Sequence, residues 1–235
     1  MGGPLSFPSI VARTNPMRIE FLAHASFLFT DERGVKFMTD PYEAGSFSGR
    51  VGYDPIDESP DVIIITHDHL DHSHTATIPG DFEVVRKEGT PRGVPVRSVP
   101  VFHDMFGGSR FGGTIDLKVF TIDGITICHC GDIGELLDEP ERRAAIGPID
   151  VLIIPTGGYY TLGPEGAAEV TRRLKPKVVI PCHYKTDKCG FDIHPVDPFL
   201  EHFDAVRVVD STSVHLSIDT LPEATQCLVL SMRYC

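Results

Sequence analysis

A strand that ends in a run of histidines and aspartates constrains this chain more than any other feature of its sequence. Residues 62–65 are a continuous β-branched run without polar alternation, which predicts a strand over residues 61–66 covered on both faces. Five His or Asp side chains follow within the six positions 67–72. A buried strand therefore delivers a dense group of polar, ligand-type side chains to one edge of a sheet.

The composition of this run is typical of a metal site. His67 and His69 lie two residues apart, so both side chains can point the same way from an extended turn and bind one cation. Asp71 and His72 can then reach a second cation nearby. Neutral imidazole and carboxylate are the ligands of catalytic zinc, which keeps one position open for water. No cysteine lies near the run, and this disfavours a structural zinc site.

Three further candidate ligands come from other parts of the chain. His103, Asp132 and His183 each lie within two residues of the end of an apolar segment that predicts a strand. A lone histidine after a strand is more often a satisfied polar residue than a ligand. We expect the three strands to share one sheet edge, and this shared placement favours ligands.

The rest of the pattern predicts sheets sandwiched by helices. A β meander opens the domain, and the Gly- and Pro-containing residues 41–60 are expected to form a flap beside the site. Strands followed by alternating strands and helices are typical of such a layered fold. The expected strands are residues 18–22, 26–30, 35–39, 61–66, 83–86, 96–101, 117–122, 125–130, 151–154, 178–180, a strand near Val206 and 214–218, with helices over 135–145 and 164–175.

Length and hydropathy predict one domain without a membrane segment. We expect residues 17–235 to form a single compact domain, because this length suffices for one substantial core. Residues 1–16 are rich in Gly, Pro and Ser and are expected to be an extension. No run reaches the roughly 18 apolar residues of a membrane-spanning helix, and no secretory signal pattern opens the chain. A soluble, cytoplasmic protein is expected.

The charge of the chain indicates its class of partner, and its length and cysteine count indicate the state of its thiols. The net charge of −12 without any Lys/Arg cluster argues against nucleic acid and favours a small-molecule substrate. The six cysteines are expected to be free thiols, since a chain of this length without a secretory signal does not need disulfides.

Beyond these patterns, the sequence resembles the metallo-β-lactamase superfamily, whose metal motif is His-x-His-x-Asp-His followed in order by His, Asp and His. The resemblance runs from Met17 to about Phe199. Within this superfamily, the sequence is most similar to the branch of Zn-dependent hydrolases that includes the bacterial L-ascorbate-6-phosphate lactonase. Ala23 and Cys182 depart from that branch without removing a ligand. The branch motifs are found at residues 22–27, 39–41, 158–164 and 181–184.

The resemblance implies a fold and a ligand set. The fold is the α/β, four-layer αββα metallo-β-lactamase sandwich. One metal is held by His67, His69 and His103, the other by Asp71, His72 and His183, and Asp132 bridges them. Two divalent cations activate a shared hydroxide, which makes Asp71 and Asp132 the catalytic candidates. Zinc is expected for a His-rich site, and two carboxylates also suit manganese or iron. The family further implies a homo-oligomer.

Other residues are candidates for supporting the ligands or contacting substrate. Asp40 and Asp68 could hydrogen-bond to ligand imidazoles. The substrate candidates are His24, Thr161, Tyr184, Lys185 and His194, of which Tyr184, Lys185 and His194 could bind an anionic group. For His24 and for the segment around Thr161, a purely structural role is an equal alternative.

The predicted function is that of a metal-dependent hydrolase acting on a small ester-like bond. The nearest family precedent is a lactone or a sugar-phosphate lactone. A small-molecule phosphodiesterase would use the same hydroxide and stays open as an alternative. A metal-binding protein without turnover is the alternative of another class, and the intact ligand set makes it the less favoured one.

Overall fold

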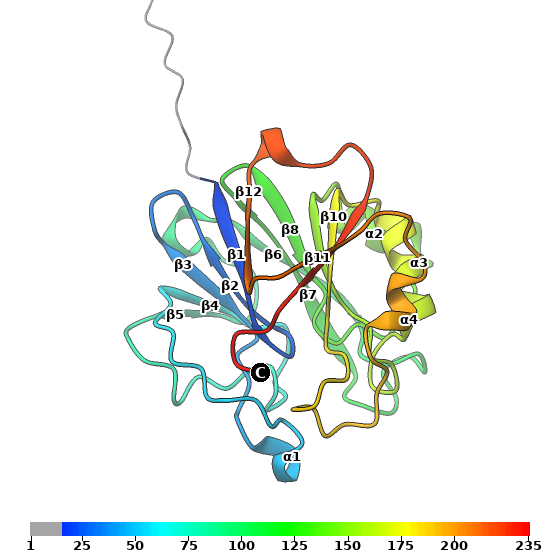
Figure 1. Cartoon of the computed structure of the whole chain (residues 1–235), viewed down its shortest axis with the longest axis horizontal. Helices are drawn as coiled ribbons and strands as arrows, with labels where there is room; N and C mark the ends of the chain where they lie inside the picture. Colours follow the sequence, from blue (N-terminus) through cyan, green and yellow to red (C-terminus); the bar gives the residue numbers. More distant parts are fainter. Residues whose placement is uncertain (1–15) are drawn as a thin grey trace, which may run out of the picture.

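Apolar strands build two sheets that pack face to face in the computed structural model, which describes residues 16–235 (Figure 1). The first sheet contains, in spatial order, β12 (Ser213–Leu216), β1 (Met17–Ala23), β2 (Ser26–Thr30), β3 (Lys36–Thr39), β4 (Val62–Ile64) and β5 (Glu83–Val85). The second contains β11 (Val206–Val209), β13 (Gln226–Leu230), β10 (Val178–Cys182), β9 (Val151–Pro155), β8 (Ile125–His129), β7 (Thr114–Ile122) and β6 (Val96–Phe102).

The core between the sheets is largely aromatic and β-branched. Phe21 and Phe27 stack with ring centroids 4.4 Å apart on the first sheet. Phe29 meets Phe120 of the second sheet edge to face at 5.3 Å. All four rings are buried, and each stabilises the fold by about 2 kcal/mol relative to an exposed ring. The predicted metallo-β-lactamase sandwich is thereby confirmed at the level of its two sheets.

Helices cover the outer face of the second sheet. They are α2 (Pro140–Ile146), α3 (Pro164–Leu174) and α4 (Asp197–Leu200), which Figure 1 shows on one side of the molecule. The helix α3 begins at a proline, whose fixed φ suits a first helical position, and it buries Ala167 and Val170. It ends at Leu174, and the next residue, Lys175, adopts a left-handed conformation before Pro176. This helix agrees with the prediction for residues 164–175.

Loops take the place of helices over much of the first sheet's outer face. The flap segment (residues 41–60) carries only the single turn α1 (Ser46–Gly49), and it buries Tyr42, Val51 and Tyr53. Phe191 and Tyr234 complete this apolar layer from distant parts of the chain. The flap segment is therefore present where it was predicted, and it also covers the first sheet as part of its outer layer.

The structure differs from the sequence prediction at a few elements. The helix expected over residues 135–145 begins only at Pro140, because Leu137 has a positive φ of 54° that breaks any earlier helical turn. The strand β13 was not predicted, although it pairs in parallel with both β10 and β11. Ile218 lies in a short 3-10 turn after β12 rather than in the strand. Of the predicted extension over residues 1–16, all but Pro16 lies outside the described residues.

Strand direction brings four strand ends to one place. The strands β8, β9 and β10 are parallel, and β6 runs the same way because both β6 and β8 are antiparallel to β7. At the end of β8, Gly131 has a φ of +48°, and a Cβ there would lie 2.5 Å from the Thr66 hydroxyl oxygen. Only glycine allows this approach. The end of β4 in one sheet therefore meets the end of β8 in the other.

Among residues 16–235, no helix combines the length and the apolar character that a membrane crossing needs.

Candidate metal centre

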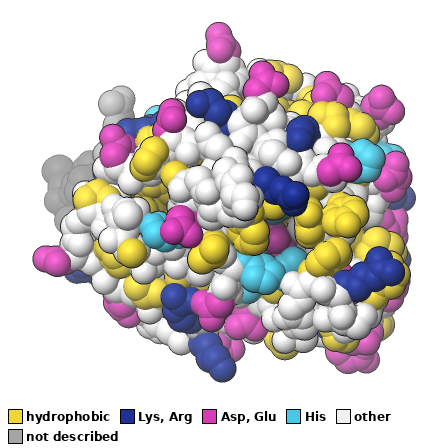
Figure 2. All heavy atoms as spheres, turned by 90° about the horizontal axis from the view of Figure 1, so that it is seen from below, with side chains coloured by type: hydrophobic (Ala, Val, Ile, Leu, Met, Phe, Trp, Pro, Cys, Tyr) yellow, Lys and Arg dark blue, Asp and Glu magenta, His cyan; other side chains and the backbone are white. Residues whose placement is uncertain are grey.

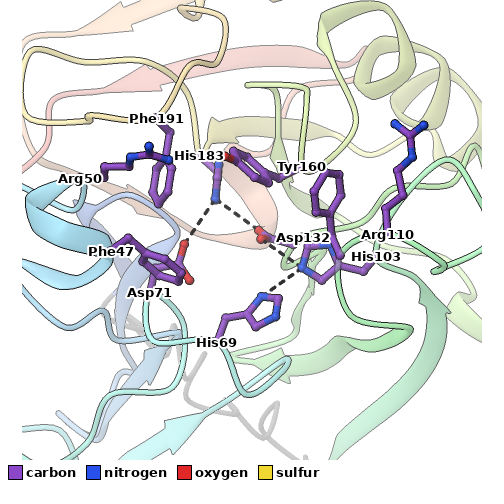
Figure 3. Close-up of a pocket in the computed structure, with 11 residues that line it drawn as sticks. Phe47, Arg50, His69, Asp71, His103, Arg110, Asp132, Tyr160, His183 and Phe191 are labelled. Carbon is purple, nitrogen blue, oxygen red and sulfur yellow. Dashed lines mark hydrogen bonds and ion pairs between the residues drawn. The ribbon is translucent and has the colours of Figure 1, made fainter.

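The structure brings the seven predicted ligand side chains together at these strand ends. Figure 3 shows five of them pointing toward a common centre, the side chains of His69, Asp71, His103, Asp132 and His183. Together with a ring nitrogen of His24, their ligand atoms form two groups of four, and within each group all ligand atoms lie within 4.8 Å of one another. One group is His67, His69, His103 and Asp132, and the other is His24, Asp71, His72 and His183.

Three ring nitrogens of the first group point at one another. His69 Nδ1 lies 3.1 Å from His67 Nε2 and 3.2 Å from His103 Nε2. The Asp132 Oδ2 atom lies 3.8 Å from His67 Nε2 and 3.6 Å from His103 Nε2. A tetrahedral zinc site with Zn–N bonds of about 2.0–2.1 Å has ligand–ligand distances of about 3.3 Å. The four side chains therefore fit one tetrahedral cation.

The second carboxylate oxygen of Asp132 faces the other group. Asp132 Oδ1 lies 3.1 Å from His72 Nε2 and 3.6 Å from His183 Nε2. Asp71 Oδ2 lies 3.9 Å from each of these two nitrogens. His72 Nε2 and Asp132 Oδ1 are both buried without a hydrogen-bond partner in the described part of the chain, despite their short separation. A second cation would require ligand atoms of this kind, which point toward one another and are not already hydrogen-bonded.

Asp40 fixes the orientation of one imidazole in this group. Its Oδ2 atom accepts hydrogen bonds from His72 Nδ1 at 2.9 Å and from the Thr66 hydroxyl at 2.6 Å. Its Oδ1 atom accepts a third from the Thr66 backbone amide at 2.8 Å. Because Nδ1 donates to the Asp40 carboxylate, the neutral form of His72 has its lone pair on Nε2, which faces the centre. Asp40 thus has the supporting place that the sequence predicts for it.

His24 lies against the candidate ligands and is not among the residues that line the cavity above them. Its Nε2 donates to Asp71 Oδ2 at 3.1 Å, and its backbone oxygen accepts from the His183 amide at 2.8 Å. Burial and the neighbouring His183 lower the pKa of His24 to about 4. A neutral His24 can therefore hold the Asp71 carboxylate in place by donating one hydrogen bond.

The pKa shifts of His67, His69 and Asp132 favour the forms of these side chains that bind a cation. Burial and the charge of His72 lower the pKa of His67 to about 3, and burial also lowers the pKa of His69. Burial alone would raise the pKa of Asp132, but His183 and His72 outweigh it and hold that pKa well below the usual range. Despite burial, Asp132 raises the pKa of His72 and of His183. These two imidazoles would therefore release a proton on binding a divalent metal, because a metal binds neutral imidazoles and ionised carboxylates.

A cavity of about 340 Å³ opens above these side chains. In Figure 2, histidine side chains lie in a hollow on this face, with hydrophobic and basic side chains beside them. The floor is formed by His69, Asp71, His103, Asp132 and His183, and the walls by Phe47, Arg50, Arg110, Phe111, Tyr160 and Phe191. A small molecule entering the cavity therefore meets the candidate metal ligands at its base.

Three of the other predicted residues lie elsewhere. Asp68 is exposed and pairs with Arg86, so it holds no ligand imidazole. Tyr184 is buried in the core, where its ring meets Phe21 edge to face at 6.3 Å. The Lys185 ammonium donates to the Phe191 backbone oxygen at 2.5 Å. Each of these side chains was expected at the site, but it contacts another partner or packs in the core instead.

Thr161 and His194 lie at a neighbouring hollow of about 240 Å³. The Thr161 hydroxyl donates to the backbone oxygen of Leu162 at 3.1 Å. His194 is exposed there, and neither residue is part of the lining of the larger cavity. The neighbouring residue Tyr160 does line that cavity.

Tyr160 belongs to the segment around Thr161 that was a predicted substrate contact, whereas the other wall residues were not predicted from the sequence. Phe47 and Arg50 come from the flap segment, which the sequence marks only as a loop beside the site. Arg110 and Phe111 belong to a glycine-rich loop that follows His103. Its Gly107, Gly108, Gly112 and Gly113 were the only signal that could have identified it.

Comparisons with known proteins agree with this geometry. Residues 18–183 match a family model described as a beta-lactamase superfamily domain. The chain is 30% identical over 200 residues to a UPF0173 metal-dependent hydrolase of Thermococcus kodakarensis, covering 72% of this chain and 85% of that protein. It is 31% identical over 229 residues to one of Pyrobaculum neutrophilum, covering 85% and 96%.

A solved structure from Thermotoga maritima is similar over nearly the whole chain. That protein is assigned as a Zn-dependent hydrolase of the metallo-β-lactamase superfamily. It is 34% identical to this chain, with a TM-score of 0.75, and the match covers 92% of this chain and all of that one.

Proposed function

Because the chain belongs to the metallo-β-lactamase superfamily and is a metal-dependent hydrolase, we propose that it uses two divalent cations to cleave an ester-like bond in a small molecule. Zinc is the cation we propose, since five imidazoles and two carboxylates make up the predicted ligand set. A lactone is the proposed substrate, and the sugar-phosphate lactone of the lactonase branch is one member of that class.

One observation carries the proposal of two cations. The two oxygens of Asp132 face different groups of ring nitrogens, with Oδ2 3.6 Å from His103 Nε2 and Oδ1 3.1 Å from His72 Nε2. A carboxylate placed in this way can serve two ions at once. The two groups of ligand residues would hold the cations, which would supply a lower pKa for a bound water molecule and a positive charge for the substrate oxygen that develops negative charge.

The chain's own groups position the reactants. Asp71 lines the cavity and is held from behind by His24, so it can orient an attacking water by accepting its hydrogen bond. Burial would raise the pKa of Asp71, but the nearby His72 and His183 and the hydrogen bond from His24 hold that pKa well below its usual range. Such a weak base orients water rather than storing its proton. The cavity volume suits a small molecule rather than a polymer.

The test is metal analysis combined with a substrate panel. We expect the purified protein to carry about two metal equivalents and to hydrolyse a lactone. Asp132→Ala and His69→Ala should lose metal and rate together, because each removes a converging ligand atom. Asp68→Ala is the matched control, since its exposed carboxylate pairs with Arg86 and should leave both unchanged.

The same panel separates the alternatives. A protein that binds metal stoichiometrically but turns over no lactone and no phosphodiester would contradict the proposal that the chain is a hydrolase of this kind. Turnover of phosphodiesters alone would replace the lactone with the alternative substrate class while leaving the two-cation site in place.

A further inference from the structure

Aromatic rings from four separate segments form one wall around the mouth of the cavity. Phe47 contacts Phe191 edge to face at 5.5 Å, Phe191 contacts Tyr160 at 5.5 Å, and Tyr160 contacts Phe111 at 5.1 Å. Edge-to-face pairs of this kind fix the orientation of each ring against the next. We call these four residues the aromatic arc. It offers an apolar surface directly above the polar floor.

Arg50 brings a positive charge to one end of the arc. Its backbone oxygen accepts a hydrogen bond from the Gly190 amide at 2.7 Å, which places it beside Phe191. A Cβ on Gly190 would lie 2.9 Å from Arg50 Cα, so the two backbones touch. In Figure 3 the Arg50 side chain extends toward the cavity near Phe191. The backbone of Arg50 is therefore anchored beside Phe191, and its side chain starts from this fixed point.

The Arg50 guanidinium has no acidic partner in the described part of the chain. Lys188 of the adjoining loop pairs with Asp54 at 3.8 Å, whereas no carboxylate of residues 16–235 lies within 4.0 Å of the Arg50 side-chain nitrogens. An arginine that lines a cavity and pairs with no carboxylate is available to an anionic ligand.

The second arginine of the wall has a different place. Arg110 lies with its guanidinium carbon 3.8 Å from the centre of the Phe106 ring, and Figure 3 shows it directed away from Asp132 and His103. Its loop is held by Asp104, whose carboxylate accepts four backbone hydrogen bonds of 2.8–3.0 Å, from Phe106, Gly108, Arg110 and Phe111. Asp104 thus fixes Phe111 in the arc, while Arg50 is the cation that faces the cavity.

We propose that Arg50 is the specificity residue of this site and that it binds an oxyanion, a carboxylate or a phosphate, at the far end of the substrate. The inference rests on the proposed hydrolase function and names its substrate class. The body of the substrate lies with an apolar face on the aromatic arc, and its ester-like bond reaches the His and Asp floor. A guanidinium binds either oxyanion through two parallel hydrogen bonds.

The experiment compares three lactones on the metal-loaded full chain. They share one ring and one acyl chain, which ends in a carboxylate, a phosphate monoester or a neutral carboxamide. Wild type should show the higher kcat/KM on one or both anionic compounds. Arg50→Met should lower that value about 10- to 100-fold, as expected for the loss of a charge-assisted hydrogen bond, and should change the carboxamide less than threefold. Arg50→Lys should restore part of the loss.

Lys188→Met is the matched control, because it removes the same charge from the adjoining loop outside the cavity. It should behave as wild type on all three compounds. Metal content and thermal unfolding, measured for every variant, distinguish a specific effect from a folding defect.

The outcomes separate this inference from the proposed function. Equal rates on all three lactones in wild type, or an equal loss on all three in Arg50→Met, would overturn the role of Arg50 while hydrolysis itself stands. Failure of the wild-type metal-loaded protein to hydrolyse any of them would instead contradict lactone hydrolysis. The ranking of the two anionic compounds identifies which oxyanion the site prefers.

Discussion

At the scale of single residues, the carboxylate of Asp40 determines which nitrogen of His72 faces the candidate metal centre. Both side chains are fully buried, so no water can replace the hydrogen bond between them. Supporting carboxylates of this kind set the tautomer and the basicity of a ligand imidazole. The position of Asp40, directly after β3, was visible in the sequence as part of a Thr-Asp-Pro segment.

Replacing Asp40 by Asn tests this arrangement. The amide can present only one oxygen to the three donors, so either His72 or Thr66 loses its acceptor. We expect metal affinity to fall about 10- to 100-fold, measured by competition with a chelator. Asp68→Asn is the control and should bind metal as wild type does, since Asp68 is exposed. Unchanged affinity in Asp40→Asn would remove Asp40 from the site.

The sequence predicted the floor of the site far better than its walls. The candidate ligands follow strand ends, and strand direction alone brings such residues together. Arg50 and Phe191 become neighbours only through the contact between two loops, which no spacing in the sequence encodes. Lys185 illustrates the converse, because its ammonium was expected at the site and is instead bound to a backbone oxygen.

At the scale of elements, the contact between the ends of β4 and β8 depends on Gly131. We expect Gly131→Ala to lower the free energy of unfolding by about 2–4 kcal/mol, because the methyl group would meet Thr66 in addition to the strain of a positive φ. Chemical denaturation of the metal-free protein measures this without a contribution from bound metal.

Gly34→Ala provides the comparison. Gly34 also has a positive φ, of +83°, but nothing lies within 4 Å of a Cβ there. The change Gly34→Ala should lower the free energy of unfolding by only about 1 kcal/mol. Equal losses in the two variants would mean that the close approach of the two strand ends adds nothing to stability.

Element boundaries were predictable where local chemistry decides them. The strand β2 and the helix α3 have the predicted bounds to within one residue. The segment before Pro140 does not, because Leu137 is drawn into the core beneath α2 with a backbone that no helix allows. The strand β13 gains its place from pairing with β10 and β11, both distant in sequence, so its short apolar run gave little warning.

At the scale of the whole molecule, Glu58 connects parts of the chain that lie far apart in sequence. Its carboxylate pairs with Lys36 of β3 at 2.8 Å and with Arg233 near the C-terminus at 2.6 Å. Arg233 also contacts Glu20 of β1 at 3.3 Å. The network fastens the flap segment and the C-terminal segment to the first sheet.

The network predicts a pH dependence of stability. Burial would raise the pKa of Glu58, but Lys36 and Arg233 outweigh it and lower that pKa. The carboxylate therefore stabilises the fold above its unfolded pKa of about 4.3, and the contribution is lost as the pH falls through the lower folded value. Glu58→Gln should cost about 1 kcal/mol at pH 7 and less at about pH 3.5, measured by urea unfolding.

Glu83→Gln, an exposed change on β5, is the control and should have the same small effect at both pH values. A cost for Glu58→Gln that does not decrease at low pH would contradict the ion-pair account.

The division between floor and walls bears on how such a protein could change its substrate. The candidate ligands follow the ends of strands in two packed sheets. Phe47, Phe111, Tyr160 and Phe191 belong to four different segments that connect the strands, and Phe47 lies in the single turn α1 of its segment. Loops tolerate replacement and insertion with little effect on the core. Each of these four segments can thus change without altering the metal ligands or the other three segments. A hydrolase of this kind can therefore acquire a new specificity through changes in a single segment.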